Sequence, residues 1–170
     1  TDGKVVLFVG AGLSVGAGYP GWRELIEQLL DEAKRVPGSL TGGIKKLENT
    51  DDFLKLAEFA RSSLGRGPYT ALLKRLYERP VAPTEAHRLI AHTNYRGLVT
   101  TNFDRLLETA ITIERRWTPT VFNSENIAAM AGALFDSQLF IYKLHGDIAS
   151  PDSIVLTSQD YDRVVLSSPH

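Results

Sequence analysis

Apolar and polar positions along the chain follow two different spacings. Short apolar runs typical of buried strands occur at residues 5–8, at 119–122 and from Gly97 and Phe140 onward, with a further short strand or edge expected at 154–156. Apolar residues three and four positions apart predict helices, whose approximate ranges are 21–36, 52–64, 69–79, 84–92, 105–116 and 127–134, with a last helix from Ser158. Alternating strands and helices are typical of a parallel sheet, so we predict an α/β fold with a Rossmann-like, doubly wound sheet.

A long helical stretch separates the first two predicted strands. A plain crossover between parallel strands is much shorter. We therefore expect a single domain over residues 1–170, with a helical insertion at about 37–96 and a glycine-rich loop at 39–50. The chain stops at 167–170 without a closing element. The sequence is thus expected to be a fragment of a longer chain, with the sheet truncated at its C-terminal end.

Composition excludes several classes of site. The apolar content of 43% suffices for a core, and a net charge of -1 without a basic stripe argues against direct nucleic-acid binding. The chain has no cysteine, which excludes disulfides and thiolate zinc sites, and its four histidines are too scattered to indicate a metal. It contains no apolar stretch near the roughly 20 residues that span a bilayer. We therefore expect a cytoplasmic protein that does not bind membranes.

The first strand runs into a glycine turn, Gly10-Ala11-Gly12-Leu13-Ser14. Glycines allow the backbone to approach a pyrophosphate, and a following helix offers free N–H groups and the positive end of its dipole. The backbone N–H groups of Ala11 and Gly12 and the Ser14 hydroxyl are the predicted phosphate ligands. The spacing matches neither the full dinucleotide fingerprint nor a P-loop, so a structural turn without a ligand stays an alternative.

Two later strands also end in polar residues. Thr101-Asn102-Phe103-Asp104 follows the second strand, and His145-Gly146-Asp147 follows the strand from Phe140. The carboxyl ends of parallel strands form the ligand crevice, so the three endings are expected to face one pocket. As alternatives, Asn102 and Asp104 cap the next helix, His145 is a satisfied polar residue, and Trp22 is a core residue of its helix.

Taken together and in this order, the three strand ends resemble the sirtuin-like family of NAD-consuming enzymes. The glycine turn with residues 18–23 resembles the family's phosphate loop and the segment over the nicotinamide. Residues 101–104 are similar to its Gln-Asn-Ile-Asp signature, and His145-Gly146 to its catalytic His-Gly. The resemblance implies NAD as the ligand and two catalytic residues, Asn102 and His145. The cofactor-binding residues that it implies are Gly10, Ala11, Gly12, Ser14, Trp22, Thr101 and Asp104.

The resemblance also implies how these side chains act. Asn102 orients an attacking water or the ribose, and His145 transfers a proton from a ribose hydroxyl or that water. Asp104 holds a ribose hydroxyl or fixes its loop. Trp22 covers the nicotinamide and excludes bulk water.

Departures from the family narrow the function. Protein deacylases of the family carry two cysteine pairs that bind zinc, and this chain has no cysteine, while Thr101 replaces a Gln and Trp22 a Phe. Residues 147–161 resemble instead the bacterial branch associated with NAD destruction in antiviral defence. This implies an NAD hydrolase without zinc, a regulated effector that acts as a homo-oligomer once a regulatory domain or partner protein senses infection. An NAD-dependent protein deacylase and a non-catalytic NAD- or nucleotide-binding sensor or assembly module stay open as alternatives.

Overall fold

The computed structural model describes residues 5–37, 52–135 and 139–167 of the chain. It divides the chain into two compact units. The first comprises Thr1–Tyr19 and Tyr77–Ile154, and the second Pro20–Leu76 and Val155–His170.

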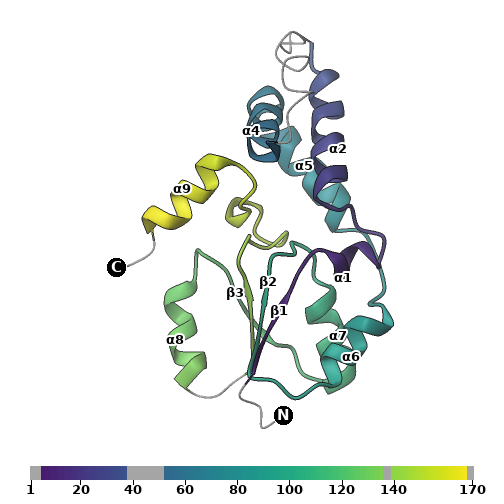
Figure 1. The fold of residues 1–170 in the computed structure, drawn as a ribbon, viewed down its shortest axis with the longest axis vertical. Helices are drawn as coiled ribbons and strands as arrows, with labels where there is room; N and C mark the ends of the chain where they lie inside the picture. Colours follow the sequence, from purple (N-terminus) through teal and green to yellow (C-terminus); the bar gives the residue numbers. More distant parts are fainter. Residues whose placement is uncertain (1–4, 38–51, 136–138, 168–170) are drawn as a thin grey trace. The chain divides into compact units, whose positions relative to one another are not determined.

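The first unit is built on a four-stranded, all-parallel sheet (Figure 1). Its strands, in spatial order, are β1 (Val6–Val9), β2 (Gly97–Thr100), β4 (Phe140–Lys143) and β3 (Thr120–Phe122). All four lie where the apolar runs predict them. The fold is α/β and Rossmann-like, as predicted.

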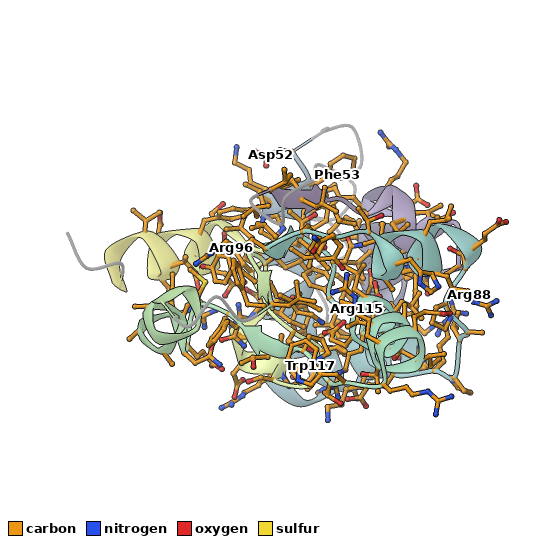
Figure 2. All side chains as sticks on the ribbon, turned by 90° about the horizontal axis from the view of Figure 1, so that it is seen from below. Asp52, Phe53, Arg88, Arg96, Arg115 and Trp117 are labelled. Carbon is orange, nitrogen blue, oxygen red and sulfur yellow. The ribbon has the colours of Figure 1, made fainter. Side chains whose placement is uncertain are left out.

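Helices cover both faces of this sheet (Figure 1). On one face α6 (Glu85–His92) and α7 (Leu106–Arg115) enclose a core that includes Leu98, Ile111 and Ile141. Arg115, which is labelled in Figure 2, links α7 to the end of α6. It donates to the carbonyl oxygens of Ala91 and Thr93, both at 2.6 Å. On the other side α8 (Ile127–Phe135) lies beside β3. The sheet is therefore doubly wound.

β1 lies at one edge of the sheet and pairs only with β2 among the described strands. On the face away from α6 and α7, Val6 is 46% and Phe8 67% exposed. In β2, Gly97 pairs with Val6, and the ring of Phe140 occupies the space that a Cβ at Gly97 would need. A side chain at Gly97 would displace that ring from the sheet.

The second unit is helical. It contains α2 (Trp22–Lys34), α4 (Phe53–Leu64), most of α5 (Arg66–Tyr77) and α9 (Ser158–Ser167). Asp52 caps α4 by accepting from the backbone N–H of Lys55 at 3.2 Å, as its position before the apolar stripe predicts. α2 and α4 pack on their apolar faces. The predicted start of α5 at residue 69 is wrong, because Gly67 and Pro68 lie in the first turn of this helix. Backbone N–H groups in a first turn have no intrahelical acceptor, so proline, which has no N–H, loses no hydrogen bond there.

The expectation of a strand at 154–156 is wrong, and the two units divide the chain at other residues than the predicted insertion does. Residues 154–156 form no strand; they follow the short 3₁₀ helix η1 (Pro151–Ser153), and the Leu156 N–H donates to the Asp160 carboxylate instead of to a neighbouring strand. The units also divide the chain differently from an insertion at 37–96, since α2 belongs to the second unit and α6 to the first. The single-domain prediction stays a prediction. The predicted loop at 39–50 lies outside the described residues.

Candidate functional site

Three adjacent strands end at the same edge of the sheet. Thr100 pairs with Val9 of β1 and with Lys143 of β4. Gly10 therefore lies one residue beyond this row, and Asn102 and His145 each lie two residues beyond it. The parallel register alone thus brings the three predicted strand ends to one edge.

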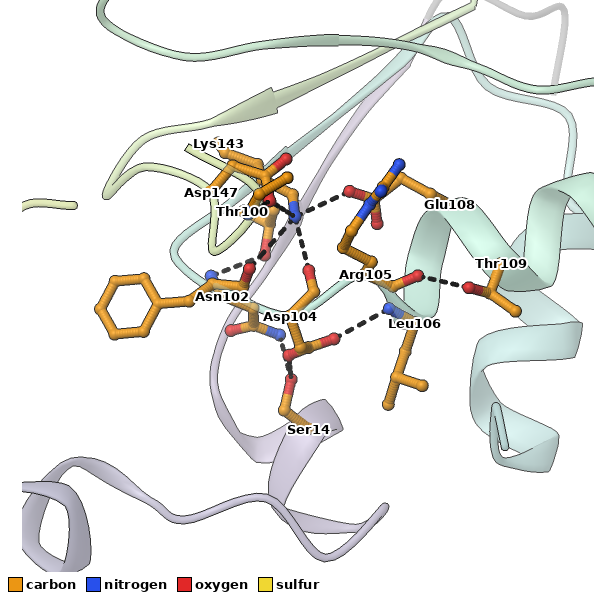
Figure 3. Close-up of polar contacts among 12 residues, drawn as sticks. Ser14, Thr100, Asn102, Asp104, Arg105, Leu106, Glu108, Thr109, Lys143 and Asp147 are labelled. Carbon is orange, nitrogen blue, oxygen red and sulfur yellow. Dashed lines mark hydrogen bonds and ion pairs between the residues drawn. The ribbon is translucent and has the colours of Figure 1, made fainter. Parts of the chain in front are cut away.

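A chain of side-chain hydrogen bonds joins the first two strand ends (Figure 3). The Asn102 amide donates to Ser14 Oγ at 2.8 Å and to the Gly10 carbonyl at 3.2 Å. The Ser14 hydroxyl in turn donates to Asp104 Oδ2 at 2.5 Å. All three side chains are buried. One predicted catalytic residue, Asn102, and three predicted cofactor-binding residues, Gly10, Ser14 and Asp104, therefore form one connected group.

Asp104 also accepts from the backbone N–H of Leu106 at 3.0 Å, at the start of α7. The N-cap of α7 is Arg105, so Asp104 makes a local turn contact just before the helix and is not its cap. Asn102 makes no cap either; its side chain turns back to the glycine turn. The predicted direct roles of both residues toward NAD stay predictions.

Asn102 keeps one unused hydrogen-bonding atom. Its Oδ1 is buried and has no partner among the residues that the structure describes. A buried acceptor without a donor costs about 1–3 kcal/mol, so native proteins rarely retain one without a reason. This oxygen can accept a hydrogen bond from a bound water or from a hydroxyl of a ligand.

The glycine turn leads into α1 (Gly12–Val15), a single helical turn. Gly10, Ala11 and Gly12 are exposed, and in the described part of the chain no acceptor takes the N–H groups of Ala11 or Gly12. So short a helix adds little dipole, contrary to the expectation of a helix that supports the phosphate. An anion at this turn could therefore bind to the free N–H groups of Ala11 and Gly12. The Ser14 hydroxyl already donates its proton to Asp104.

His145 lies in the turn after β4 and is half-buried. Burial lowers its pKa below the usual 6.5, so the imidazole is neutral at pH 7 and able to accept a proton. Gly146 has a φ of +87°, and the carbonyl group of Ser153 occupies the place of a Cβ. The residue after His145 must therefore be glycine.

Sequence reasoning missed the buried ion cluster beneath these loops. Lys143 is fully buried, and its Nζ lies 2.7 Å from Glu108 Oε1 and 3.3 Å from Asp147 Oδ1 (Figure 3). Burial raises the pKa of Glu108, and the neighbouring Lys143 opposes that rise. A lysine at a core-facing position of an apolar strand was the available signal.

The remaining predicted residues are less connected. Thr101 is half-buried and donates its N–H to the Val9 carbonyl at 3.4 Å. Trp22 is the first residue of α2 in the second unit, and its role over the nicotinamide stays a prediction.

One pocket of about 330 Å³ opens in the first unit, but none of the predicted site residues lines it. Its walls include the stacked rings of Tyr19 and Tyr77, with Arg79 and Arg105. Arg105 follows Asp104 in sequence, so the pocket adjoins the second strand end without including its polar side chains. The connected polar side chains lie at the strand ends instead.

The described residues show neither a metal-binding cluster nor a membrane-spanning helix. They contain no group of three His, Cys, Asp or Glu side chains able to hold a metal ion. Within the same ranges, no helix combines the length and apolar character needed to cross a membrane. The predictions of a zinc-free and cytoplasmic protein stay predictions.

Comparison with known proteins identifies similar chains. Residues 96–170 match the SIR2-like domain family. The chain is 28% identical over 162 residues to the NAD(+) hydrolase ThsA of Bacillus cereus (strain MSX-D12), and 31% identical over 163 residues to that of Enterococcus faecium. It is 27% identical over 164 residues to Defense-associated sirtuin 2 of Bacillus subtilis.

These alignments cover 94–95% of this chain, but it spans only 31% of each of the two hydrolases and 15% of the Bacillus subtilis protein.

Proposed function

We propose that the chain is a sirtuin-like domain that hydrolyses NAD at the bond between nicotinamide and ribose. The relatives whose names state an activity are NAD(+) hydrolases. Hydrolysis consumes one water, releases nicotinamide as a neutral base and leaves ADP-ribose and one proton. The domain therefore has to hold the dinucleotide, position a water and accept a proton.

Asn102 carries this proposal. Its amide nitrogen is fixed by Gly10 and Ser14, and its Oδ1 is buried without a partner in the described chain. A rigid amide with one unused acceptor is suited to orient a water or a ribose hydroxyl. Ser14 positions Asn102 instead of binding phosphate through its hydroxyl.

His145 is the proposed proton acceptor. Its lowered pKa keeps the imidazole neutral near pH 7, which a general base requires. It follows β4, directly beside the strand that leads to Asn102. A positioned base of this kind contributes typically 10²–10⁴-fold to a rate.

The glycine turn is the proposed pyrophosphate site. The exposed N–H groups of Ala11 and Gly12 support this, since anions bind at such backbone donors. Gly10 lets the backbone approach, and Thr101 and Asp104 are proposed contacts on the ribose side. Trp22 is proposed to cover the nicotinamide.

We further propose that the domain is a regulated effector of antiphage defence. The support is the name of the relative Defense-associated sirtuin 2. Depletion of NAD harms the cell that carries the enzyme, so the activity has to be held off until a regulatory domain or a partner protein senses infection. The same proposal includes three further points. The protein acts as a homo-oligomer, it needs no zinc, and it works in the cytoplasm, where NAD is available.

The test is NAD turnover by the protein, with nicotinamide and ADP-ribose separated by chromatography. We expect nicotinamide release without an acylated peptide, and its loss in Asn102→Ala and His145→Ala while circular dichroism shows an intact fold. His92→Ala is the matched control, since that side chain is exposed and pairs with Glu114 away from the strand ends.

Release that requires an acylated peptide would instead establish a deacylase. NAD binding without any turnover would indicate a sensor or assembly module. Equal turnover in both site variants would contradict the site assignment.

A further inference from the structure

We propose that Lys143 is a positioning residue: its ammonium group fixes the loop of Asn102 and Asp104 against the loop that begins at His145. This inference rests on the proposed function. No step of the reaction requires Lys143 to touch NAD.

The contacts of Lys143 point to this role (Figure 3). Its Nζ donates to the carbonyl oxygens of Asp104 at 2.5 Å and of Phe103 at 3.3 Å. These carbonyls belong to the turn between Asn102 and α7. The ammonium group therefore holds the backbone that carries the proposed catalytic amide.

The same ammonium group reaches the other loop. Asp147, two residues beyond His145, lies 3.3 Å from Nζ through its Oδ1, which also accepts from the Ala149 N–H at 2.9 Å. A second link runs in parallel, since the Ile148 N–H donates to the Phe103 carbonyl at 3.0 Å. The two loops are thus joined at both side-chain and backbone level.

Stability alone is a poor reason for such a cluster. Lys143 and Glu108 are both buried, and removing a charged pair from water costs several kcal/mol per ion before any gain from pairing. Well-packed apolar residues often replace buried pairs without loss of stability. The distinguishing feature here is where the ammonium donates: to the backbone beside Asn102.

The experiment separates fold stability from positioning. In Lys143→Met/Glu108→Leu both members of the pair become apolar, so no unpaired carboxylate is left at position 108. The melting temperature is still expected to fall, because the buried Asp147 carboxylate and the Asp104 carbonyl lose the ammonium group. The Asp104 carbonyl loses its lysine donor and the Phe103 carbonyl keeps only the Ile148 N–H, so kcat for NAD cleavage should fall about 10²-fold, the effect of a misplacement near 1 Å. KM should change little, because the glycine turn is untouched.

A control variant destabilises the protein without touching the loops. Ile111→Val shortens a fully buried side chain in the core of α7, so it lowers the melting temperature and is expected to keep kcat. A stable double variant with wild-type kcat would overturn the proposal. If the double variant shows no cooperative melting, Lys143→Gln takes its place with the same measurements.

A second measurement does not depend on activity. The side-chain amide of Asn102 gives two NMR signals that report its bonds to Gly10 and Ser14. In the double variant these signals should shift or broaden, and unchanged signals would overturn positioning. Absence of nicotinamide release by the wild type would count against the proposed function alone, because the NMR result stands without it.

Discussion

The Ser14 hydroxyl donates to Asp104 Oδ2 across 90 residues of sequence, at 2.5 Å. It connects the turn after β1 to the loop after β2, and Ser14 also accepts from the Asn102 amide. A serine in a phosphate-loop pattern thus serves as the central link of a buried network.

Replacing Ser14 tests that link. Ser14→Ala leaves Asp104 Oδ2 and one Asn102 N–H without partners, so the free energy of unfolding should fall by about 1–3 kcal/mol. We expect kcat to fall as well, because Ser14 positions the Asn102 amide. Urea unfolding measures the first and nicotinamide release the second. Ser62→Ala, on the exposed side of α4, is the control and should stay within about 0.5 kcal/mol of wild type. Equal stability of the two variants would contradict the network.

Gly12→Val tests the turn as an anion site. No atom lies within 4 Å of a Cβ at Gly12, so the fold should tolerate the side chain. The added methyl groups would stand beside the free N–H groups and block a pyrophosphate, and calorimetry should detect no NAD binding. Unchanged affinity would refute the phosphate-loop interpretation. The control Gly132→Ala is equally uncrowded, lies in α8, and should bind as wild type does.

Two glycines with the same backbone conformation provide a matched pair. Gly18 and Gly146 have φ values of +86° and +87°, but only at Gly146 would a Cβ collide with backbone, at Ser153. Gly18→Ala should therefore cost about 1–2 kcal/mol of strain, and Gly146→Ala clearly more. Urea unfolding of both variants checks the order. An equal loss would mean that the Ser153 segment moves aside without cost.

Stability should fall in mild acid. Burial lowers the pKa of His87 and of His145 below 6.5, so between the folded pKa and 6.5 the unfolded chain binds more protons. The free energy of unfolding should thus be flat above pH 6.5 and decrease below it. Unfolding of wild type and His87→Gln at pH 7.5 and 5.5 tests this, since the variant loses one of the two groups. An identical decrease in both would show that His87 does not contribute.

In the second unit, Asp160 is expected to be a stability residue. It accepts from the N–H groups of Leu156 and Thr157 and pairs with Arg61 at 2.7 Å. Burial alone raises the pKa of Asp160, but these hydrogen bonds together lower it below 3.8, so its stabilisation is present above that pH and lost as pH falls through the folded pKa.

Asp160→Asn should accordingly lower the free energy of unfolding by about 1–3 kcal/mol at pH 7. The difference from wild type should shrink as the pH falls below 3.8. A pH-independent difference would rule out the charge as its cause. Asp162→Asn, an exposed neighbour on α9, is the control.

Sequence patterns predict helices and strands well where residues close in sequence determine them. Asp52 and Thr84 precede helices and do begin them, and the apolar runs locate all four strands. Residues 154–156 are as apolar and buried as a strand, yet the Leu156 N–H donates to the Asp160 carboxylate and the Ile154 N–H to the Pro151 carbonyl, so neither is left for a sheet. Propensity does not reveal which acceptor lies nearby.

In the candidate site, too, the sequence pattern predicts some features and contacts between distant segments determine the others. The three predicted strand ends do meet at one edge of the sheet, and the catalytic roles of Asn102 and His145 that the family resemblance implies stay predictions. The partners of Ser14 and the carbonyls that Lys143 holds depend on contacts between distant segments, and no spacing rule encodes them.

The pairing of β1 with β2 has a consequence for synthesis on the ribosome. Val6 pairs with Gly97, so β1 emerges about 90 residues before its partner, which at 5–20 residues per second is roughly 5–20 s. α2 and α4, by contrast, lie close together in sequence and can dock during that interval. Leu7 and Val9, which pack into the core beside β2 in the finished fold, are then open to chaperones until β2 arrives. We therefore expect chaperone supply during translation to limit the yield of this protein more than the strength of its finished core.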